Sequence, residues 1–251
     1  MKIFIDGYGF VAHSILRKLI ENFSVNPANI LVNTYSGNEN EGFRLFCESM
    51  GVTNLNQNYS NTLLKSYIRD LNPDYVLSLY GRRLLPDYLI QGAKLGNFNL
   101  HPSFLPDYKG CFSVPWAIIN QEKTTGITIH EMTSEFDKGD ILYQEKIDIS
   151  TSETAFSLYH KLAGRFIQIF DDFFEDFITQ KLTSTPMPIG GRYFKRELPF
   201  DGVIGRGWTN EKVDAFIRAL HFPPHRGALC ECRGELIECE TFDKYKLLKN
   251  I

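Results

Sequence analysis

The hydrophobic positions in the first part of the chain alternate between two patterns. Short apolar runs, typical of buried strands, occupy Lys2–Asp6, Ile30–Tyr35, Tyr75–Tyr80 and Asn97–His101. Between these runs, apolar residues recur at helical spacing over Phe10–Asn22, Glu41–Met50 and Asn61–Leu71. Strands that alternate with helices predict an α/β fold, with a Rossmann-like, mostly parallel sheet covered by helices on both faces.

The same alternation continues into the second half of the chain. Two further strands are predicted over Thr125–Met132 and Asp140–Ile149, separated by the acidic turn Ser134–Gly139. A long amphipathic helix is predicted from Glu153 to Lys181. Residues 183–200 then contain three prolines and two adjacent glycines, a composition that breaks regular structure and indicates a boundary.

The pattern after this boundary is no longer that of an α/β protein. Thr209–Leu220 predicts a short capped helix, and Ala228–Phe242 predicts a β-hairpin that turns at Arg233-Gly234. We therefore expect a catalytic domain over residues 1–182 and a small helix and β-hairpin region over residues 183–251. Because a helix and a hairpin cannot bury two apolar faces alone, we expect this region to join two subunits into a homodimer.

Composition narrows the class of protein. A chain of 251 residues with 43% hydrophobic content buries a full core, and its net charge of −3 argues against a broad nucleic-acid surface. The N-terminus becomes acidic after three apolar residues, so we expect neither a signal peptide nor a membrane span, and a cytoplasmic location. Five cysteines at irregular spacing favour reduced thiols. Cys230, Cys232 and Cys239 lack a CxxC pair, so no metal site is expected.

A glycine-rich turn follows the first predicted strand. Gly7-Tyr-Gly9-Phe-Val-Ala12 matches the fingerprint of dinucleotide-binding proteins. That fingerprint also needs an acid about 20 residues further on, or an arginine for a 2′-phosphate. Asn33–Gly37, at the end of the second strand, supplies neither. We therefore expect a turn for close strand–helix packing, with a phosphate or substrate contact as the alternative and a nicotinamide enzyme as the competing class.

Two polar side chains end the fourth predicted strand. Asn99 and His101 are two residues apart, so they project from one face of the strand, and Pro102 stops the strand directly afterwards. Ligand crevices of open α/β sheets lie at this carboxyl end. The pair therefore indicates a site, although a hydrogen-bonded polar plug is the alternative.

The surrounding residues carry a resemblance to a known family. The motif reads Asn99-x-His101-x-Ser103-x-x-Pro106-x-Tyr108-Lys109-Gly110, followed by Gly126-x-Thr128-x-His130 and Asp137-x-Gly139. It resembles the folate-dependent formyltransferases. The resemblance implies a catalytic triad of Asn99, His101 and Asp137, with N10-formyltetrahydrofolate as co-substrate and no metal. Lys109 stands where the family usually carries arginine, which keeps the charge and loses the bidentate geometry.

The implied chemistry fits these residue types. An amine attacks the formyl carbon, and Asn99 donates to the oxyanion that develops. His101 removes the proton of the amine and returns one to N10 of the folate, and Asp137 orients the imidazole or a proton-relaying water.

Three classes of acceptor compete within the resemblance. An initiator tRNA would need a basic C-terminal domain, whereas this end of the chain carries four glutamates between residues 231 and 240. A glycinamide ribonucleotide enzyme would end soon after the long helix. The segment Arg218–Gly227 resembles the nucleotide-binding segment of bacterial sugar N-formyltransferases. The favoured acceptor is therefore dTDP-4-amino-4,6-dideoxyglucose, used for O-antigen or other surface lipopolysaccharide; a dTDP-3-amino sugar or glycinamide ribonucleotide are the alternatives.

The resemblance also implies binding residues. Phe222, stiffened by two prolines, is expected to stack on the base, and Arg82, Lys109 or Arg226 to meet the diphosphate. A turn that docks the hairpin is the alternative for Phe222. Further acceptor-binding candidates are Ser103 and Tyr193, and the loop with Tyr80, Leu85 and Pro86 is expected to border the folate mainly through backbone groups. From other classes, an NADP-linked oxidoreductase and a non-catalytic nucleotide-sugar binding module remain open.

Overall fold

The computed structural model describes residues 1–34, 37 and 40–249, and the chain folds into two compact units. The first unit comprises residues 1–101, 128–144 and 164–187, and the second unit comprises residues 102–127, 145–163 and 188–251. Both units draw on several stretches of the chain. The acceptor-binding and dimerisation roles of residues 183–251 stay predictions.

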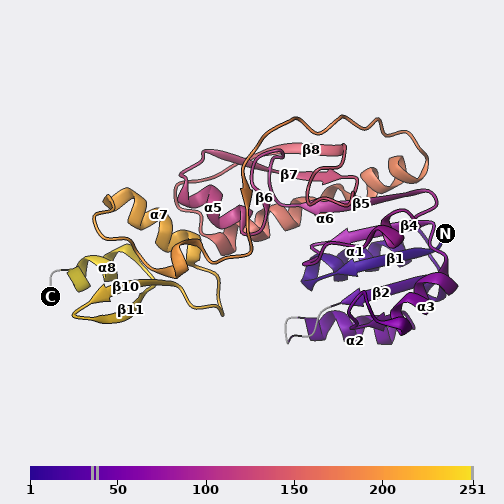
Figure 1. The fold of residues 1–251 in the computed structure, drawn as a ribbon, viewed down its shortest axis with the longest axis horizontal. Coiled ribbons are helices and arrows are strands. Elements are labelled where there is room, and N and C mark those ends of the chain that lie inside the picture. The colour runs from indigo at the N-terminus through magenta and orange to yellow at the C-terminus, as the bar shows by residue number, and fades with distance from the viewer. Residues whose placement is uncertain (35–36, 38–39, 250–251) are drawn as a thin grey trace. The chain divides into compact units, whose positions relative to one another are not determined.

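The structure contains a seven-stranded sheet in the order β3-β2-β1-β4-β5-β7-β8 (Figure 1). Strands β1 to β5 pair in parallel, and β7 pairs antiparallel with β5. The strand bounds are β1 Ile3–Gly7, β2 Ile30–Thr34, β3 Thr53–Leu55, β4 Tyr75–Leu79, β5 Gly96–His101, β7 Thr124–His130 and β8 Ile141–Asp148. The predicted mostly parallel α/β fold is confirmed. The end of the second predicted strand, Tyr35, lies outside the described residues.

Helices cover both faces of this sheet. On one face, Val76 of β4 shares a core cluster with Leu64 and Ile68. On the other face, the neighbouring Tyr75 lies edge-on to Phe174, with ring centroids 6.2 Å apart. Successive strand residues point to opposite faces, which explains why adjacent residues meet different helices. In chain order, the bounds of the helices up to residue 178 are α1 Gly9–Glu21, α2 Glu41–Ser49, α3 Thr62–Leu71, α4 Asp87–Ile90, α5 Ser113–Ile119, which packs on α7 (Asn210–Leu220) in the second unit, and α6 Ala155–Ile178.

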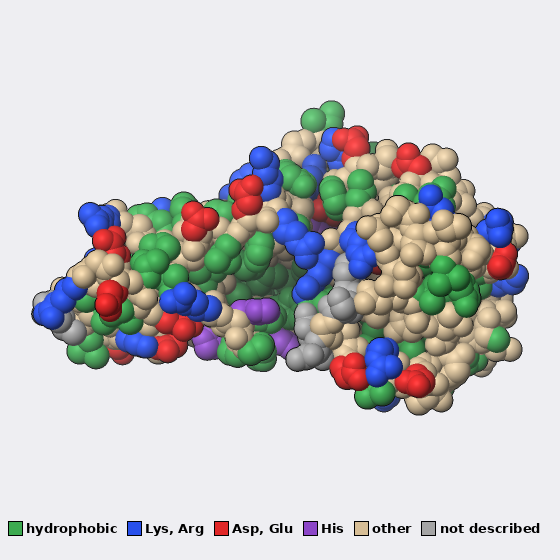
Figure 2. Space-filling model, turned by 60° about the horizontal axis from the view of Figure 1, so that its bottom comes forward, with side chains coloured by type: hydrophobic (Ala, Val, Ile, Leu, Met, Phe, Trp, Pro, Cys, Tyr) green, Lys and Arg blue, Asp and Glu red, His purple; other side chains and the backbone are tan. Residues whose placement is uncertain are grey.

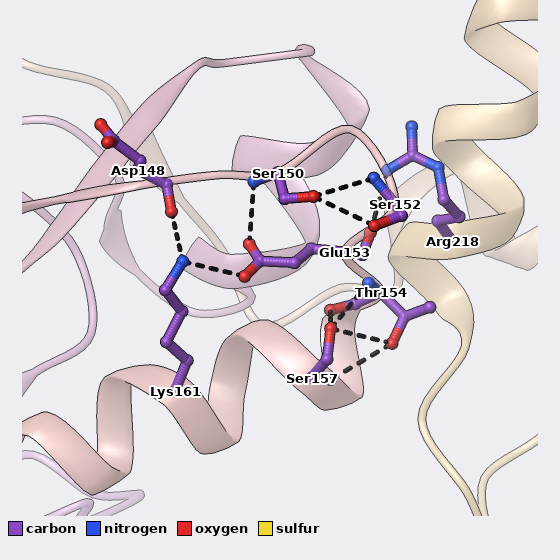
Figure 3. Close-up of polar contacts among 8 residues, drawn as sticks. All are labelled: Asp148, Ser150, Ser152, Glu153, Thr154, Ser157, Lys161 and Arg218. Atoms are coloured by element: carbon purple, nitrogen blue, oxygen red, sulfur yellow. Dashed lines mark hydrogen bonds and ion pairs between the residues drawn. The ribbon is translucent and has the colours of Figure 1, made fainter.

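The start of α6 is fixed by a network of polar contacts within the second unit (Figure 3). Thr154 Oγ1 accepts a hydrogen bond from the Ser157 backbone N–H at 3.2 Å, which satisfies one of the free donors of the first turn. Lys161 Nζ donates to Glu153 Oε1 at 2.9 Å, and Arg218 Nη1 donates to the Glu153 carbonyl at 2.9 Å. Arg218 therefore ties the helix start to the C-terminal part of the same unit.

The C-terminal region forms the predicted helix and hairpin. Helix α7 spans Asn210–Leu220 with Thr209 as its N-cap, and the hairpin strands are β10 Ala228–Cys232 and β11 Glu235–Cys239. Arg233 and Gly234 both have positive φ, 50° and 85°, which a tight hairpin turn requires. The remaining elements are a two-stranded pair, β6 Lys109–Gly110 with β9 Tyr193–Phe194, the 3-10 helices Pro27–Asn29 and Pro199–Gly202, and α8 Phe242–Lys249. None of the described helices has the length and hydropathy to span a bilayer.

Candidate active site

The carboxyl end of β5 and the end of β7 bring polar side chains to one face of the sheet. In the antiparallel register, Asn99 pairs with His130 and His101 pairs with Thr128. Directly opposed residues of an antiparallel pair point to the same side. The alternation that places Asn99 and His101 on one face therefore adds His130 to the same face, within the first unit.

Asp137 reaches this group from the turn between β7 and β8. Its Oδ1 lies 3.6 Å from His101 Nδ1 and 3.4 Å from His130 Nε2. All three side chains are buried, with whole-residue exposures of 5% for His101, 2% for His130 and 7% for Asp137. The carboxylate therefore stands between two imidazoles and is shielded from water, where charge interactions are stronger than at the surface.

Gly139 explains how the turn comes so close to β7. A β carbon at this position would lie 1.9 Å from the carbonyl oxygen of Glu131, so only glycine fits. The backbone N–H of Glu131 also donates to the carbonyl of Asp140 at 2.9 Å. Burial, and then the nearby Asp140, raise the pKa of Glu131. The glycine thus lets the acidic turn fold back onto the strand that carries His130.

His130 connects the carboxylate to the amide of Asn99. Its Nδ1 lies 2.7 Å from the Glu131 carbonyl, and its Nε2 lies 3.1 Å from Asn99 Nδ2. A backbone carbonyl only accepts, so Nδ1 carries the proton, and in the neutral ring Nε2 accepts from Asn99. This contact fixes the amide orientation and leaves the second amide hydrogen to donate elsewhere. His130 is not among the site residues that the sequence predicts, although the Gly126-x-Thr128-x-His130 pattern contains it.

The other predicted acceptor-binding residues take part in local contacts. In the first unit, the Arg82 guanidinium lies 3.5 Å from the centroid of the Tyr8 ring. In the second unit, the buried Lys109 donates from Nζ to the Gly190 carbonyl at 2.8 Å, and the buried Ser103 hydroxyl donates to the Asp107 carbonyl at 2.8 Å. Their roles toward an acceptor stay predictions, as do those of Arg226 and of Tyr193, which is exposed on β9.

The predicted folate loop follows β4 directly. Tyr80 is the first residue after β4 and has a positive φ of 59°, and Pro86 is the N-cap of α4. Leu85 is 3% exposed and belongs to the core cluster. A β carbon on Gly81 would lie 2.4 Å from Asp6 Oδ2, which shows how closely the loop approaches β1. The loop is therefore shaped by packing, and its folate contacts stay a prediction.

The glycine-rich turn serves packing. A β carbon on Gly7 would lie 2.8 Å from the Ala12 β carbon, and the Gly9 backbone N–H donates to Asn40 Oδ1 at 2.8 Å. The first glycine thus allows the close strand–helix approach expected from sequence. Because an amide side chain takes the Gly9 N–H, this turn has one donor fewer for a phosphate.

A pocket of about 210 Å³ lies in the second unit, around Phe222. It is formed by the end of α7, the following loop and strand β11. The lining residues are Ile217, Leu220, His221, Phe222, Pro223, Pro224, His225, Gly227, Glu238, Cys239 and Glu240. Among the described residues, no group of three or more His, Cys, Asp or Glu side chains is arranged to hold a metal ion.

Comparison with known proteins identifies the family. A family model described as formyl transferase matches residues 25–170. GDP-perosamine N-formyltransferase from Brucella melitensis is 34% identical over 251 residues, which covers 98% of this chain and 95% of that protein. The bifunctional polymyxin resistance protein ArnA of Wigglesworthia glossinidia brevipalpis is 36% identical over 168 residues, or 66% of this chain and 26% of that protein. The chain belongs to the formyl transferase family.

Solved structures agree on the fold. WlaRD, a sugar 3N-formyl transferase, superposes with a TM-score of 0.77 at 22% identity, covering 94% of this chain and 84% of that one. A 4-N formyltransferase from Francisella tularensis gives a TM-score of 0.74 at 23% identity, covering 96% and 97%. The prediction of a formyltransferase enzyme related to the sugar N-formyltransferases is confirmed.

Proposed function

We propose that this enzyme transfers the formyl group of N10-formyltetrahydrofolate to the amine of a nucleoside-diphosphate-linked amino sugar. The observation that carries the proposal is the buried cluster of His101, His130, Asp137 and Asn99 at the carboxyl end of β5. The near full-length match to a GDP-perosamine N-formyltransferase supports an amino sugar over the other acceptors of the family. We place the reaction in the cytoplasm and its product in surface polysaccharide such as O-antigen.

The geometry supports a proposed task for each side chain of the cluster. Because Asp137 lies next to Nδ1 of His101, the imidazole carries its hydrogen on Nδ1 and keeps a lone pair on Nε2. That nitrogen takes the proton from the attacking amine once the new C–N bond has formed. The separation of 3.6 Å is an ion-pair distance, so the carboxylate stabilises the imidazolium mainly through its charge.

Collapse of the tetrahedral intermediate completes the transfer. The bond between the formyl carbon and N10 breaks, and His101 returns its proton to N10, which leaves as a neutral amine. During both steps, Asn99 donates its second amide hydrogen to the oxyanion, while His130 holds the first. The folate is a co-substrate, and the proposed steps use only side chains of this cluster.

The more specific part of the proposal is the identity of the nucleotide that carries the amino sugar. The sequence favours dTDP-4-amino-4,6-dideoxyglucose through the resemblance of Arg218–Gly227, whereas the relative matched over nearly its whole length is named for a GDP sugar. Two solved relatives, at 22% identity, are described with dTDP and 5-N-formyl-THF, and with folinic acid and dTDP-3-aminofucose. Both nucleotides are therefore candidates, and amines on C-3 and C-4 belong in the same assay.

The test is a turnover assay with N10-formyltetrahydrofolate and a panel of GDP- and dTDP-linked 3-amino and 4-amino sugars. We expect one of the sugars to gain the mass of a formyl group in step with loss of the folate formyl group. His101→Ala is the matched control and should form product about 10²–10⁴-fold more slowly. Formylation of glycinamide ribonucleotide alone would contradict the proposal.

We also propose a homodimer through the C-terminal region. Leu236 on β11 and Leu247 on α8 are 49% and 67% exposed, and they offer apolar surface that a second subunit would cover. Light scattering should give the mass of two chains for the wild type and of one chain for Leu236→Glu/Leu247→Glu. A monomeric wild type would contradict this proposal and leave the enzymatic one untouched.

A further inference from the structure

The pocket around Phe222 combines an aromatic ring with carboxylates. Its volume of about 210 Å³ is smaller than the roughly 300–1,000 Å³ of pockets that enclose whole small ligands, so it suits one part of a ligand. Ile217 and Leu220 line it with apolar surface, and Glu238 and Glu240 line it from β11 and the residue that follows. An apolar slot with acceptor groups is suited to a flat ring that carries hydrogen-bond donors.

Phe222 is held in place by other rings of the second unit. It lies edge-on to Phe156, with centroids 5.6 Å apart, and edge-on to Tyr159 at 5.3 Å. His160 and His225 lie beside the same ring. Figure 2 shows histidine side chains gathered beside hydrophobic ones on this part of the molecule. A ring fixed by its neighbours loses little entropy when a base stacks on it.

Glu238 is the acceptor group whose orientation is fixed. The Gly227 backbone N–H donates to its Oε1 at 2.5 Å, and the side chain is half-buried at the pocket wall. A β carbon on Gly227 would lie 3.1 Å from the same oxygen, so glycine leaves the carboxylate room at this position. The neighbouring Glu240 forms an ion pair with Lys244 at 2.6 Å. A carboxylate has about four lone-pair sites, and Gly227 uses one, so Glu238 keeps acceptor capacity on both oxygens.

We propose that this pocket binds a guanine base, with Glu238 reading its hydrogen-bonding edge and Phe222 stacking on its face. Guanine presents two adjacent donors, N1–H and the exocyclic N2 amine, which match the two oxygens of one carboxylate in a bidentate pair. This inference rests on the proposed function, since the base belongs to the nucleotide of the acceptor. It makes a guanosine diphosphate sugar the substrate class.

Thymine presents the opposite pattern to this carboxylate. Its one donor, N3–H, is flanked by two carbonyl oxygens, which a carboxylate repels. Stacking on Phe222 does not distinguish the two bases, because every base has an aromatic face. The discrimination therefore comes from Glu238.

Binding of nucleoside diphosphates to the whole protein tests the inference by calorimetry with GDP, inosine diphosphate and dTDP. Inosine diphosphate lacks only the exocyclic amine of guanine. The wild type should bind GDP roughly 10-fold or more tightly than either of the others, within the range for one bidentate contact to a base. In Glu238→Gln, which loses one acceptor and gains a donor, the preference for GDP over inosine diphosphate should disappear.

The matched control is Glu235→Gln, which removes the same charge from an exposed position on the same strand outside the pocket. It should keep the wild-type order of affinities, and thermal melting should show that both variants are folded. Equal binding of GDP and inosine diphosphate by the wild type would overturn the inference without reference to any variant. So would a Glu238→Gln protein that keeps the wild-type ratio.

The turnover assay separates this inference from the proposed function. If the wild type formylates no nucleotide amino sugar but binds GDP through Glu238, the proposed function is wrong and the base assignment holds. If it formylates dTDP sugars and binds GDP no better than inosine diphosphate, the proposed function holds and the guanine assignment is wrong.

Discussion

The cluster around His101 and the pocket around Phe222 differ in how deeply their side chains are buried and in how firmly the fold fixes them. In the cluster, His101, His130 and Asp137 are at most 7% exposed and come from paired strands and a glycine-dependent turn. In the pocket, Phe222 and Glu238 are half-buried, and His225 is exposed on a loop. Charges in the cluster act at low dielectric on groups that are already oriented, whereas the pocket meets its ligand from water.

Under the proposed function, the cluster carries out the reaction and the pocket selects the nucleotide. Preorganised donors and bases accelerate a reaction because they do not reorganise as charge develops. A half-open pocket contributes through stacking and edge contacts, each worth a small part of the binding free energy. We therefore expect substitutions in the cluster to reduce kcat, and substitutions in the pocket to reduce nucleotide affinity.

The largest effect is expected for His101→Ala. Loss of the proton-transfer group should lower kcat by about 10²–10⁴-fold. The protein should stay folded, because the His101 imidazole stands at the carboxyl end of β5 and serves proton transfer rather than the packing of the apolar core. Turnover and thermal melting on the same sample check this. An unfolded variant, or one with full activity, would show that the cluster supports packing only.

Asn99→Ala should have the next largest effect. Removal of one oxyanion donor costs about 100-fold or more in kcat, with little change in the KM for either substrate. Asn99→Asp is an informative companion, because it keeps the size and replaces the amide donors with a carboxylate. An effect confined to KM would remove Asn99 from the oxyanion and make it a ground-state binding residue.

The local sequence pattern was sufficient to predict the first strands of the sheet and two residues of the cluster, Asn99 and His101. Strands β1, β2 and β4 are buried on both faces and read as continuous apolar runs, and Asn99 and His101 followed from alternation and a terminating proline. Thr53–Leu55 was missed, because three partly exposed residues carry no periodicity. Helix α5 was missed because Pro115 interrupts its pattern, and α8 because none of its described residues is buried.

The remaining members of the site depend on contacts between distant residues. His130 ends a strand that is buried from Thr125 onward, where a single histidine is commonly a core residue, and only the antiparallel register with β5 places it beside Asn99. Asp137 was assigned through the family resemblance, since a turn of six residues does not specify where it folds. Glu238 pairs with Leu229 on the hairpin, so its alternation predicted a strand but not a pocket wall.

In the pocket, Phe222→Ala should weaken nucleotide binding by about 1–3 kcal/mol, the range for base–aromatic stacking. Affinity for the folate should be unchanged, because stacking on the base does not involve the co-substrate. Calorimetric titration with GDP and with 5-formyltetrahydrofolate measures both. The loss should be similar for every base, in contrast to Glu238→Gln. A variant that binds nucleotides normally would leave Phe222 with only its packing role against Phe156 and Tyr159.

The smallest expected effect is a difference in alkylation rate between two buried thiols, Cys47 in the first unit and Cys239 in the second unit. Burial raises the pKa of Cys47 on α2 to about 12, and burial, followed by the nearby Cys230, raises the pKa of Cys239 at the pocket wall to about 11. The thiolate is the reactive form, so at pH 8 both should be alkylated far more slowly than the half-buried Cys232. Cys239 should still react faster than Cys47, because its pKa is lower and its pocket opens to water.

Iodoacetamide labelling followed by peptide mass spectrometry gives the rates, with urea-unfolded protein as the control in which all five cysteines react. GDP should slow labelling of Cys239 and leave Cys47 unchanged, since only the former lines the pocket; equal protection of both would mean that the nucleotide stabilises the whole protein rather than filling this site.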